Sequence, residues 1–391
     1  MNELNQTIPL SPVDYIFTGA GSQPITFAFY YPEKQNEGKL RDSLNEALKH
    51  FRVLKSKLKR ISGTSFVFDI YSDTLDIETH QIKSDFDKND NITRYISPVK
   101  SIDGNPLAKV SLTHLNKGSV LALSISHTLV DGFSYFHFLS SWIRICKSEK
   151  FILPHIDRNL FSDFIRTNKK EVTKDELLYN CGLFYGDKRT DIESTANYRE
   201  FIQAETIKEI SERARNKNIL LTDNDVITAM LWKKFMTSWN KKGFDTETYL
   251  TFPFDFRRAL NGFPKNYFGC AITFGTTKLG LLELAEKLEE EIAAYVKNSV
   301  SKIKNDYINT ALNTLENFRN QKGIDEFEKL HVRHPENGII ITNISRLPVR
   351  ELDFGEGAPT QILTYNEVPG SAAILPAPGG VEILAASPII Y

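Results

Sequence analysis

Cysteine is scarce in this sequence, with only Cys146, Cys181 and Cys270 among 391 residues. An odd number without a Cys-x-x-Cys pair argues against a disulfide framework and a thiolate zinc site, so we expect no bound metal. No apolar run reaches the roughly 18 residues that a membrane-spanning helix requires. The first residues also lack the charge and hydropathy pattern of a signal peptide. These absences favour a cytoplasmic protein without a membrane span.

An excess of either charge is also missing, because 48 Lys and Arg residues are balanced by 49 Asp and Glu residues. A nucleic-acid-binding surface usually gives a basic balance, so we expect no nucleic-acid partner. Hydrophobic residues make up 41% of the chain and charged residues 25%, which is typical of a globular protein. A chain of this length usually forms two domains or one large one.

Hydrophobic periodicity predicts helices and strands in mixed order along the chain. The expected helices cover residues 39–60, 133–146 and 279–318, with a break near Ser299 in the last. The expected strands cover residues 25–31, 108–115 and 120–126, with further short strands within 339–384. Thr222 and Asp225 have the spacing of a helix capping box. Because strands and helices do not alternate regularly, we expect an α+β fold, or an α/β fold with mixed sheets.

A polar stretch between about residues 168 and 198 separates the two halves of the chain. Domain boundaries usually fall in such segments. We therefore expect an N-terminal domain over residues 1–170, a crossover linker over 171–198 and a C-terminal domain over 199–391.

The stretch Ser-Ile-Ser-His-Thr-Leu-Val-Asp-Gly, residues 124–132, joins an expected strand to an expected helix. It places His127 where the strand ends and Asp131 directly before the helix. A neutral imidazole has a pKa near 6.5 and accepts a proton at physiological pH. A buried Asp131 would need a Lys or Arg partner, because an unpaired buried carboxylate is costly. The alternative is structural, with the histidine satisfied at a strand end and the aspartate capping the helix.

Five segments, in order along the chain, resemble the BAHD acyltransferases, relatives of chloramphenicol acetyltransferase. Residues 127–142 resemble that family's His-x-x-x-Asp-Gly motif. Residues 255–270 are similar to its Arg-containing stretch ending in Tyr-Phe-Gly-Asn. Residues 342–357 resemble its Thr-Ser-Trp segment and its Asp-Phe-Gly-Trp-Gly motif. Residues 10–14 and 222–232 match two further positions, so the resemblance covers nearly the whole chain.

The resemblance implies a role for each matching residue around the histidine. His127 is expected to be the general base, with Asp131 directed away from the substrate and paired with an arginine. By position the partner is Arg257, with Arg258 as the neighbouring candidate. Gly132 would leave room for substrate beside the base, although a turn glycine explains it equally well.

Three segments depart from the family pattern. The family tryptophan that follows Thr-Ser is Ile344, which cannot donate to an oxyanion; Thr342, Asn343 or a backbone amide remain as candidate donors. Removing one oxyanion donor typically costs about 2.7–4 kcal/mol in the barrier.

The DFGxG motif reads Asp353, Phe354, Gly355, Glu356, Gly357. Its Asp353 and Gly355 are expected to support the site structurally, and Glu356 puts the local packing in doubt. The asparagine after Tyr-Phe-Gly is replaced by Cys270, for which the sequence offers no interpretation.

The fold implied is two similar-sized chloramphenicol acetyltransferase-like domains with mixed sheets and an active-site channel between them. The activity implied is transfer from acyl-CoA, a co-substrate, to a small hydroxylated or amino acceptor, in specialised metabolism and in a monomer. No covalent acyl-enzyme is expected, because the chain has no Gly-x-Ser-x-Gly elbow, and no permanently bound cofactor is expected.

Two alternatives remain open. One is a condensation-type enzyme with a carrier-protein donor, although such domains usually have a second histidine where Ser126 stands here. The other is a small-molecule binding protein that has lost the reaction.

Overall fold

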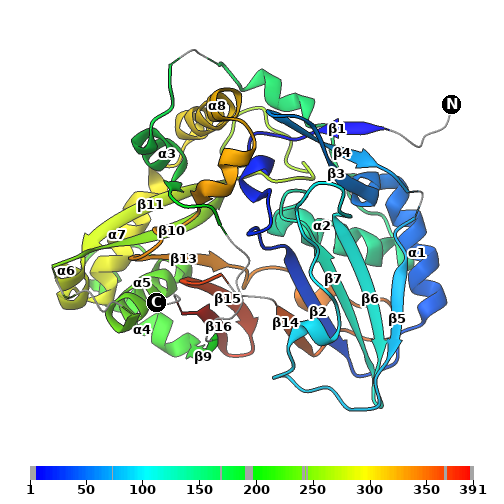
Figure 1. The fold of residues 1–391 in the computed structure, drawn as a ribbon. Helices are drawn as coiled ribbons and strands as arrows, with labels where there is room; N and C mark the ends of the chain where they lie inside the picture. The colour runs from blue at the N-terminus through cyan, green and yellow to red at the C-terminus, as the bar shows by residue number, and fades with distance from the viewer. Residues whose placement is uncertain are drawn as a thin grey trace.

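Two mixed β-sheets organise this computed structural model, which describes residues 6–72, 74–167, 170–189, 197–239, 243, 245–364 and 368–387. Figure 1 shows the sheets side by side, with the N-terminal half of the chain around one and the C-terminal half around the other. The first sheet has the order β14-β2-β7-β6-β5, in which β5 and β6 are parallel and the other neighbours antiparallel. Its strands are β2 (Ile25–Tyr31), β5 (Ile77–Gln81), β6 (Ala108–His114), β7 (Ser119–Ile125) and β14 (Gln361–Thr364).

The second sheet has the order β11-β10-β13-β15-β16-β9. Its two central pairs, β10 with β13 and β13 with β15, are parallel, and the outer pairs are antiparallel. Its strands are β9 (Asn197–Gln203), β10 (Glu247–Asp255), β11 (Ile272–Gly280), β13 (Gly338–Asn343), β15 (Ser371–Ala377) and β16 (Gly380–Ala386). The predicted fold class, with mixed sheets and helices in irregular order, is confirmed.

Two smaller sheets, eight α-helices and six short 3-10 helices complete the secondary structure of the described residues. The small sheets are β1 (Thr7–Pro9) with β4 (Ser65–Ile70) and β3 (Ser56–Ser62), and β12 (Leu330–His331) with β8 (Phe184–Tyr185). The helices are α1 (Glu37–His50), α2 (Gly132–Cys146), α3 (Lys174–Cys181), α4 (Ala204–Asn216), α5 (Asp223–Trp239), α6 (Leu281–Glu286), α7 (Glu289–Ser301) and α8 (Asn305–Lys322).

Strand β7, which leads to the histidine turn, is buried along its whole length. Its alternate side chains enter different parts of the core: Leu121 and Leu123 belong to the main cluster, while Val120 and Ala122 pack in a separate one with residues of β2 and β14. A strand buried on both faces reads as a continuous apolar run, which is why the sequence predicted it well.

The helix predicted over residues 39–60 is wrong beyond His50. A 3-10 helix, Arg52–Lys55, follows α1, and the chain then enters β3. In β3, buried Ser56 and Leu58 alternate with the more exposed Lys57 and Lys59. This two-residue period of burial is typical of a strand, but it was hard to recognise because only Leu58 of the four residues is apolar.

The predicted linker is partly regular structure. Thr173 and Glu176 form a capping box for α3, which packs on α8, and β8 pairs with β12. Residues 168–169 and 190–196 of this stretch lie outside the described residues, and the domain division remains a prediction.

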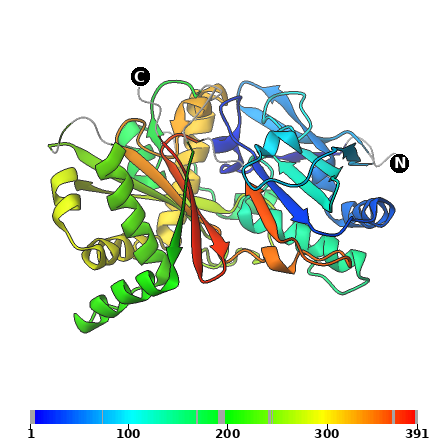
Figure 2. The same ribbon diagram turned by 90° about the horizontal axis from the view of Figure 1, so that it is seen from below.

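The C-terminal part of the chain returns to the first sheet. Strand β14 pairs antiparallel with β2, and the two lie together in both views (Figures 1 and 2). The segment before it carries the DFGxG motif, which therefore crosses from one sheet to the other.

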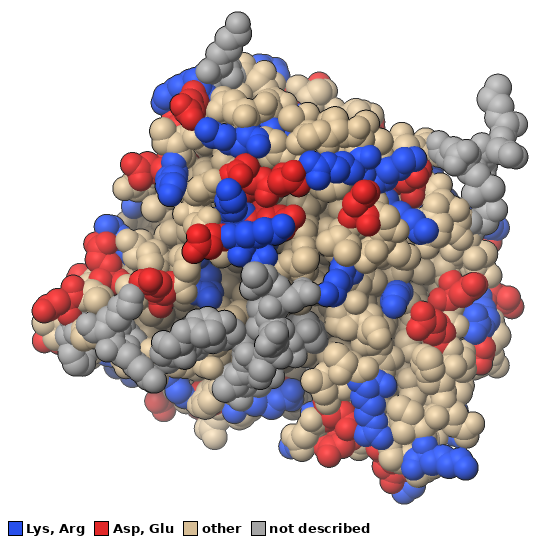
Figure 3. All heavy atoms as spheres, in the orientation of Figure 1, with Lys and Arg blue, Asp and Glu red and all other residues tan. Residues whose placement is uncertain are grey.

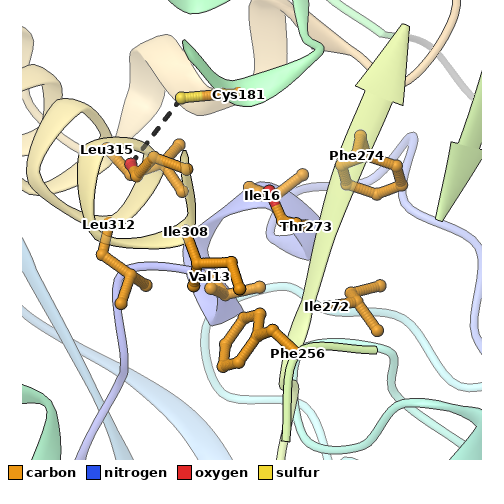
Figure 4. A pocket seen from close by; sticks show the side chains of 11 residues that line it. Val13, Ile16, Cys181, Phe256, Ile272, Thr273, Phe274, Ile308, Leu312 and Leu315 are labelled. Carbon is orange, nitrogen blue, oxygen red and sulfur yellow. Dashed lines mark hydrogen bonds between the residues drawn. The ribbon is translucent and has the colours of Figure 1, made fainter. Parts of the chain in front are cut away.

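An apolar contact joins the two halves near the 3-10 helix η1 (Asp14–Phe17). Val13 and Ile16 face Phe256, Phe274 and side chains of α8 around a cavity of about 10 Å³, at most the size of one water (Figure 4). This contact fixes η1 between the halves.

Charged side chains of both signs are interspersed on the face seen in Figure 3. Within the described residues, no helix is both long and apolar enough to cross a bilayer.

Candidate active site

His127 lies in a tight turn between β7 and α2. Ser126 organises this turn, because its carbonyl accepts from the amides of Leu129 and Val130 and its hydroxyl accepts from the amide of Thr128. Leu129 and Val130 are fully buried, so the turn is anchored in the core on either side of its polar groups. His127 itself is only half-buried.

Asp131 caps α2, and its carboxylate accepts four hydrogen bonds. One oxygen, Oδ1, accepts from the amide of Ser134 at 2.9 Å and from Nη2 of Arg257 at 3.0 Å. The other, Oδ2, accepts from Nη1 of Arg257 at 2.7 Å and from the amide of Ala271 at 2.9 Å. The carboxylate therefore has two protein donors at each oxygen.

Burial by itself raises the pKa of Asp131, but the Arg257 charge and the hydrogen bonds outweigh it and leave the pKa below its ordinary value. The side chains of both partners are 2% exposed. A buried pair of this kind requires its remaining donors and acceptors to be satisfied.

Arg257 meets that requirement. Beyond Asp131, its guanidinium donates to the carbonyls of Tyr267 and Gly269, to the hydroxyl of Ser134 and to Asp255. The guanidinium also lies 4.4 Å over the Phe133 ring, a cation–π contact. The neighbouring candidate from the sequence, residue 258, is an exposed arginine, so the structure brings Arg257 and not Arg258 to Asp131.

Two side chains that the sequence did not assign to the site contact the ring of His127. The Phe17 ring stacks on the imidazole, with centroids 3.8 Å apart and planes inclined by 9°. The Cys270 thiol donates to the carbonyl oxygen of His127 at 2.8 Å, and its sulfur lies 3.6 Å from Nδ1.

Burial lowers the pKa of His127, and a hydrogen bond to its own backbone carbonyl and the Asp131 charge offset this only in part. The ring is therefore neutral at physiological pH, which is the state a general base requires. Within the described residues, no group hydrogen bonds to Nε2.

A Cβ built on Gly132 meets no described atom within 4 Å, and the residue does not have a positive φ. Neither backbone conformation nor packing within the described residues therefore demands glycine at the first position of α2. The space next to Gly132 therefore contains no atom of the described residues.

A second buried ion pair supports the histidine turn. Arg158 donates from Nε to Asp14 at 2.8 Å, with both side chains inaccessible to solvent, and from Nη2 to the carbonyl of Leu129 at 3.0 Å. Asp14 belongs to a segment that the sequence had matched to the family, but no pattern around Arg158 indicated its partner.

The DFGxG segment lies at a different place, against α1 and α2. Asp353 accepts from the amides of Gly355 and Gly357 at 2.7 and 2.9 Å and from Nζ of Lys147 at 3.1 Å. Nζ of Lys39 donates to the carbonyl of Phe354 at 2.8 Å. These contacts turn the chain back toward β14.

Glu356, which departs from the family motif, is accommodated without disturbing this segment. Its carboxylate lies 4.0 Å from Nζ of Lys39, with both side chains partly exposed. Gly355 has φ +115°, a backbone conformation that residues with a side chain rarely adopt, so glycine is favoured at this position.

The candidate oxyanion donors differ in how far the protein engages them. The Asn343 amide donates to Asn224 at 2.7 Å, and its oxygen accepts from the amide and hydroxyl of Ser345. The Thr342 hydroxyl makes no hydrogen bond to any described residue. Ile344 is half-buried and packs against the core.

No group of three His, Cys, Asp or Glu side chains suited to a metal ion occurs among the described residues. The arrangement as a whole offers a neutral imidazole in a braced turn. A neutral imidazole held in this way can accept the proton of a nucleophile that attacks a carbonyl carbon.

Comparison with known proteins agrees with this class of site. A family model described as "Transferase family" matches residues 2–388. Anthranilate N-benzoyltransferase protein 2 of Dianthus caryophyllus is 24% identical over 396 residues, which cover 91% of this chain and 86% of that protein. The structure of F. graminearum TRI101 with coenzyme A and T-2 mycotoxin has a TM-score of 0.79 at 13% identity, covering 98% of this chain and 95% of that one. Vinorine synthase has a TM-score of 0.73 at 17% identity, covering 99% and 91%.

The chain therefore belongs to the Transferase family, that of the BAHD acyltransferases. Its fold is the two-domain, chloramphenicol acetyltransferase-like fold of those structures.

Proposed function

We propose that the protein transfers an acyl group from an acyl-CoA thioester to the hydroxyl or amine of a small-molecule acceptor, with His127 as general base. The observation that carries this proposal is the half-buried imidazole, neutral by burial, in a turn braced by the Asp131–Arg257 pair. Asp131 acts through the position of the turn, since all four of its hydrogen bonds go to the protein.

In the proposed reaction, Nε2 of His127 accepts the proton of the acceptor as its oxygen or nitrogen attacks the thioester carbonyl. The tetrahedral oxyanion then collapses, the carbon–sulfur bond breaks, and the coenzyme A thiolate leaves with the proton from the imidazolium. The Thr342 hydroxyl is the preferred oxyanion donor, because the side-chain NH2 of Asn343 already donates to Asn224 and its side-chain oxygen accepts from the amide of Ser345. Arg257 and Asp131 supply no proton; they hold the turn.

The named relatives support an acyl-CoA donor and leave the acceptor open. Anthranilate N-benzoyltransferase protein 2 is named for transfer of benzoyl to an amine, and the similar structure of TRI101 was solved with coenzyme A. Two further relatives, hydroxycinnamoyl-CoA:piscidic acid hydroxycinnamoyltransferase of Actaea racemosa and shikimate O-hydroxycinnamoyltransferase of Nicotiana tabacum, are named for transfer of hydroxycinnamoyl groups. An active-site channel between the two domains, a monomeric state, a cytoplasmic location and a role in specialised metabolism remain part of this proposal.

The test is a transfer assay with acetyl-, benzoyl- and hydroxycinnamoyl-CoA against panels of alcohols and amines, with products identified by mass spectrometry. His127→Ala should lose at least about 100-fold in rate. His80→Ala is the matched control, because His80 is 53% exposed on β5 and should leave the rate unchanged.

Transfer at equal rates by wild type and His127→Ala would refute the role of His127. Turnover with an acylated carrier protein but with no acyl-CoA would favour the condensation-type alternative. Saturable binding of acyl-CoA without any product would favour the binding-protein alternative.

A further inference from the structure

The imidazole of His127 is enclosed on one face by Phe17 and along its Nδ1 edge by Cys270. We propose that these two side chains are positioning residues for the base. Phe17 fixes the plane of the ring, and Cys270 fixes the backbone carbonyl beside Nδ1. The proposal rests on the function proposed for His127.

The Nδ1 edge decides which nitrogen is the base. The Nδ1 edge lies against protein atoms, because the Cys270 sulfur is 3.6 Å from Nδ1 and its thiol donates to the carbonyl oxygen of His127 at 2.8 Å. A proton on Nδ1 would leave the lone pair on Nε2, which is the tautomer that the proposed base requires. Burial raises the pKa of the Cys270 thiol well above its ordinary value, so the thiol keeps its proton and donates to the same carbonyl. Cys270 therefore holds the backbone of His127 and covers the Nδ1 edge of its ring.

The face of the ring is fixed through η1. Phe17 is buried, with 8% of the residue exposed, and its backbone carbonyl accepts from the hydroxyl of Thr128 at 2.7 Å. The buried pair of Arg158 with Asp14 ties the same 3-10 helix to the carbonyl of Leu129. The segment that carries the Phe17 ring is thus attached to the histidine turn at two places, Thr128 and Leu129, which directly follow His127.

The other side of η1 is held by the C-terminal half. Val13 and Ile16 point into the apolar contact with Phe256 and Ile308 that Figure 4 shows. The ring of Phe17 therefore has a fixed support, and His127 lacks the freedom to rotate away from the acceptor. A displacement of about 1 Å at a reacting group can cost as much as about 100-fold in rate.

The test replaces the flat ring by an apolar side chain of another shape. Phe17→Leu should lower kcat about tenfold with KM within about twofold, because the acceptor site is unchanged while the base loses its plane. Phe29→Leu is the matched control: Phe29 is fully buried in β2 and contacts Phe27 and Phe136 rather than the base. It should lower Tm and leave kcat unchanged.

Coupling to His127 separates a positioning role from a structural one. In the His127→Ala background, Phe17→Leu should cause no further loss of the residual rate, because there is no ring left to position. A further tenfold loss there would overturn the proposal. Cys270→Ala should also lower kcat, whereas Cys270→Ser keeps a donor to the carbonyl and should restore most of it; equal kcat for the two would overturn the role of Cys270.

Failure of this inference is distinguishable from failure of the proposed function. If His127→Ala abolishes transfer while Phe17→Leu and Cys270→Ala keep the wild-type kcat, only the positioning role is refuted. If His127→Ala keeps the wild-type rate, the proposed function is refuted and this inference with it.

Discussion

Replacing Asp131 by Asn should destabilise the protein and inactivate it together. The carboxylate accepts two donors at each oxygen, so whichever way the new amide is oriented, its NH2 group faces two N–H groups. In one orientation these are Nη1 of Arg257 and the amide of Ala271, and in the other Nη2 of Arg257 and the amide of Ser134. Breaking a buried ion pair from one side costs about 3–5 kcal/mol.

This cost corresponds to a measurable shift in the melting temperature. At about 2.1 cal/mol/K per residue, a chain of 391 residues has an unfolding entropy of about 0.8 kcal/mol/K, so Tm should fall by about 4–6 °C. Calorimetry and denaturant titration of the wild type and Asp131→Asn measure the loss, and the transfer assay measures the rate on the same samples.

The chain offers a control on the same arginine. Asp255 also accepts from Nη1 of Arg257, at 3.1 Å, but its side chain is 45% exposed. Asp255→Asn should therefore cost about 1 kcal/mol or less. The reasoning is refuted if Asp131→Asn loses activity with an unchanged free energy of unfolding, which would indicate that Asp131 takes part in proton transfer directly.

Three further outcomes follow from the same site. First, the pKa of Asp131 is lowered in the folded state, so the contribution of its carboxylate to stability is present above the unfolded pKa of about 3.9 and is lost as pH falls through the folded pKa. The difference in unfolding free energy between wild type and Asp131→Asn should therefore be large at pH 6 and shrink below pH 4. Second, Gly132→Ala should keep or raise Tm, because the added methyl meets no described atom and alanine favours a helix by up to about 1 kcal/mol relative to glycine. The same substitution should raise KM, and an unchanged KM would show that no substrate group occupies that space. Thr342→Val should lower kcat by about 100-fold or more at similar KM if the hydroxyl stabilises the oxyanion, and a wild-type kcat would assign this role to another donor.

Local patterns in the sequence predicted the elements that lead to the site. Strand β2 has the predicted limits, and α2 begins one residue before the predicted start. The capping box is formed, since the Thr222 hydroxyl accepts from the amide of Asp225 and the Asp225 carboxylate accepts from the amide of Thr222. These features depend on hydrophobic period and on side chains within one helical turn.

Contacts between distant parts of the chain were much harder to predict. The resemblance indicated Asp131 and Arg257, which are 126 residues apart, because both stand in matching motifs. Arg158 and Asp14 are 144 residues apart, and Arg158 stands in no recognisable motif. The contact of Phe17 with the ring of His127 was not indicated by any motif either. A buried arginine is indistinguishable from a surface one in a single sequence, because burial is decided by tertiary packing.

The position of the His127 imidazole depends on both halves of the chain at once. Asp131 lies on the N-terminal side and its partner Arg257 follows strand β10 of the second sheet, while Cys270 precedes β11 of the same sheet. Without the C-terminal half, Asp131 would lose its cation and the turn its thiol donor, and an unpaired buried carboxylate is not a stable arrangement. The half that carries His127 therefore lacks by itself two of the groups that hold the histidine turn, the Arg257 guanidinium and the Cys270 thiol.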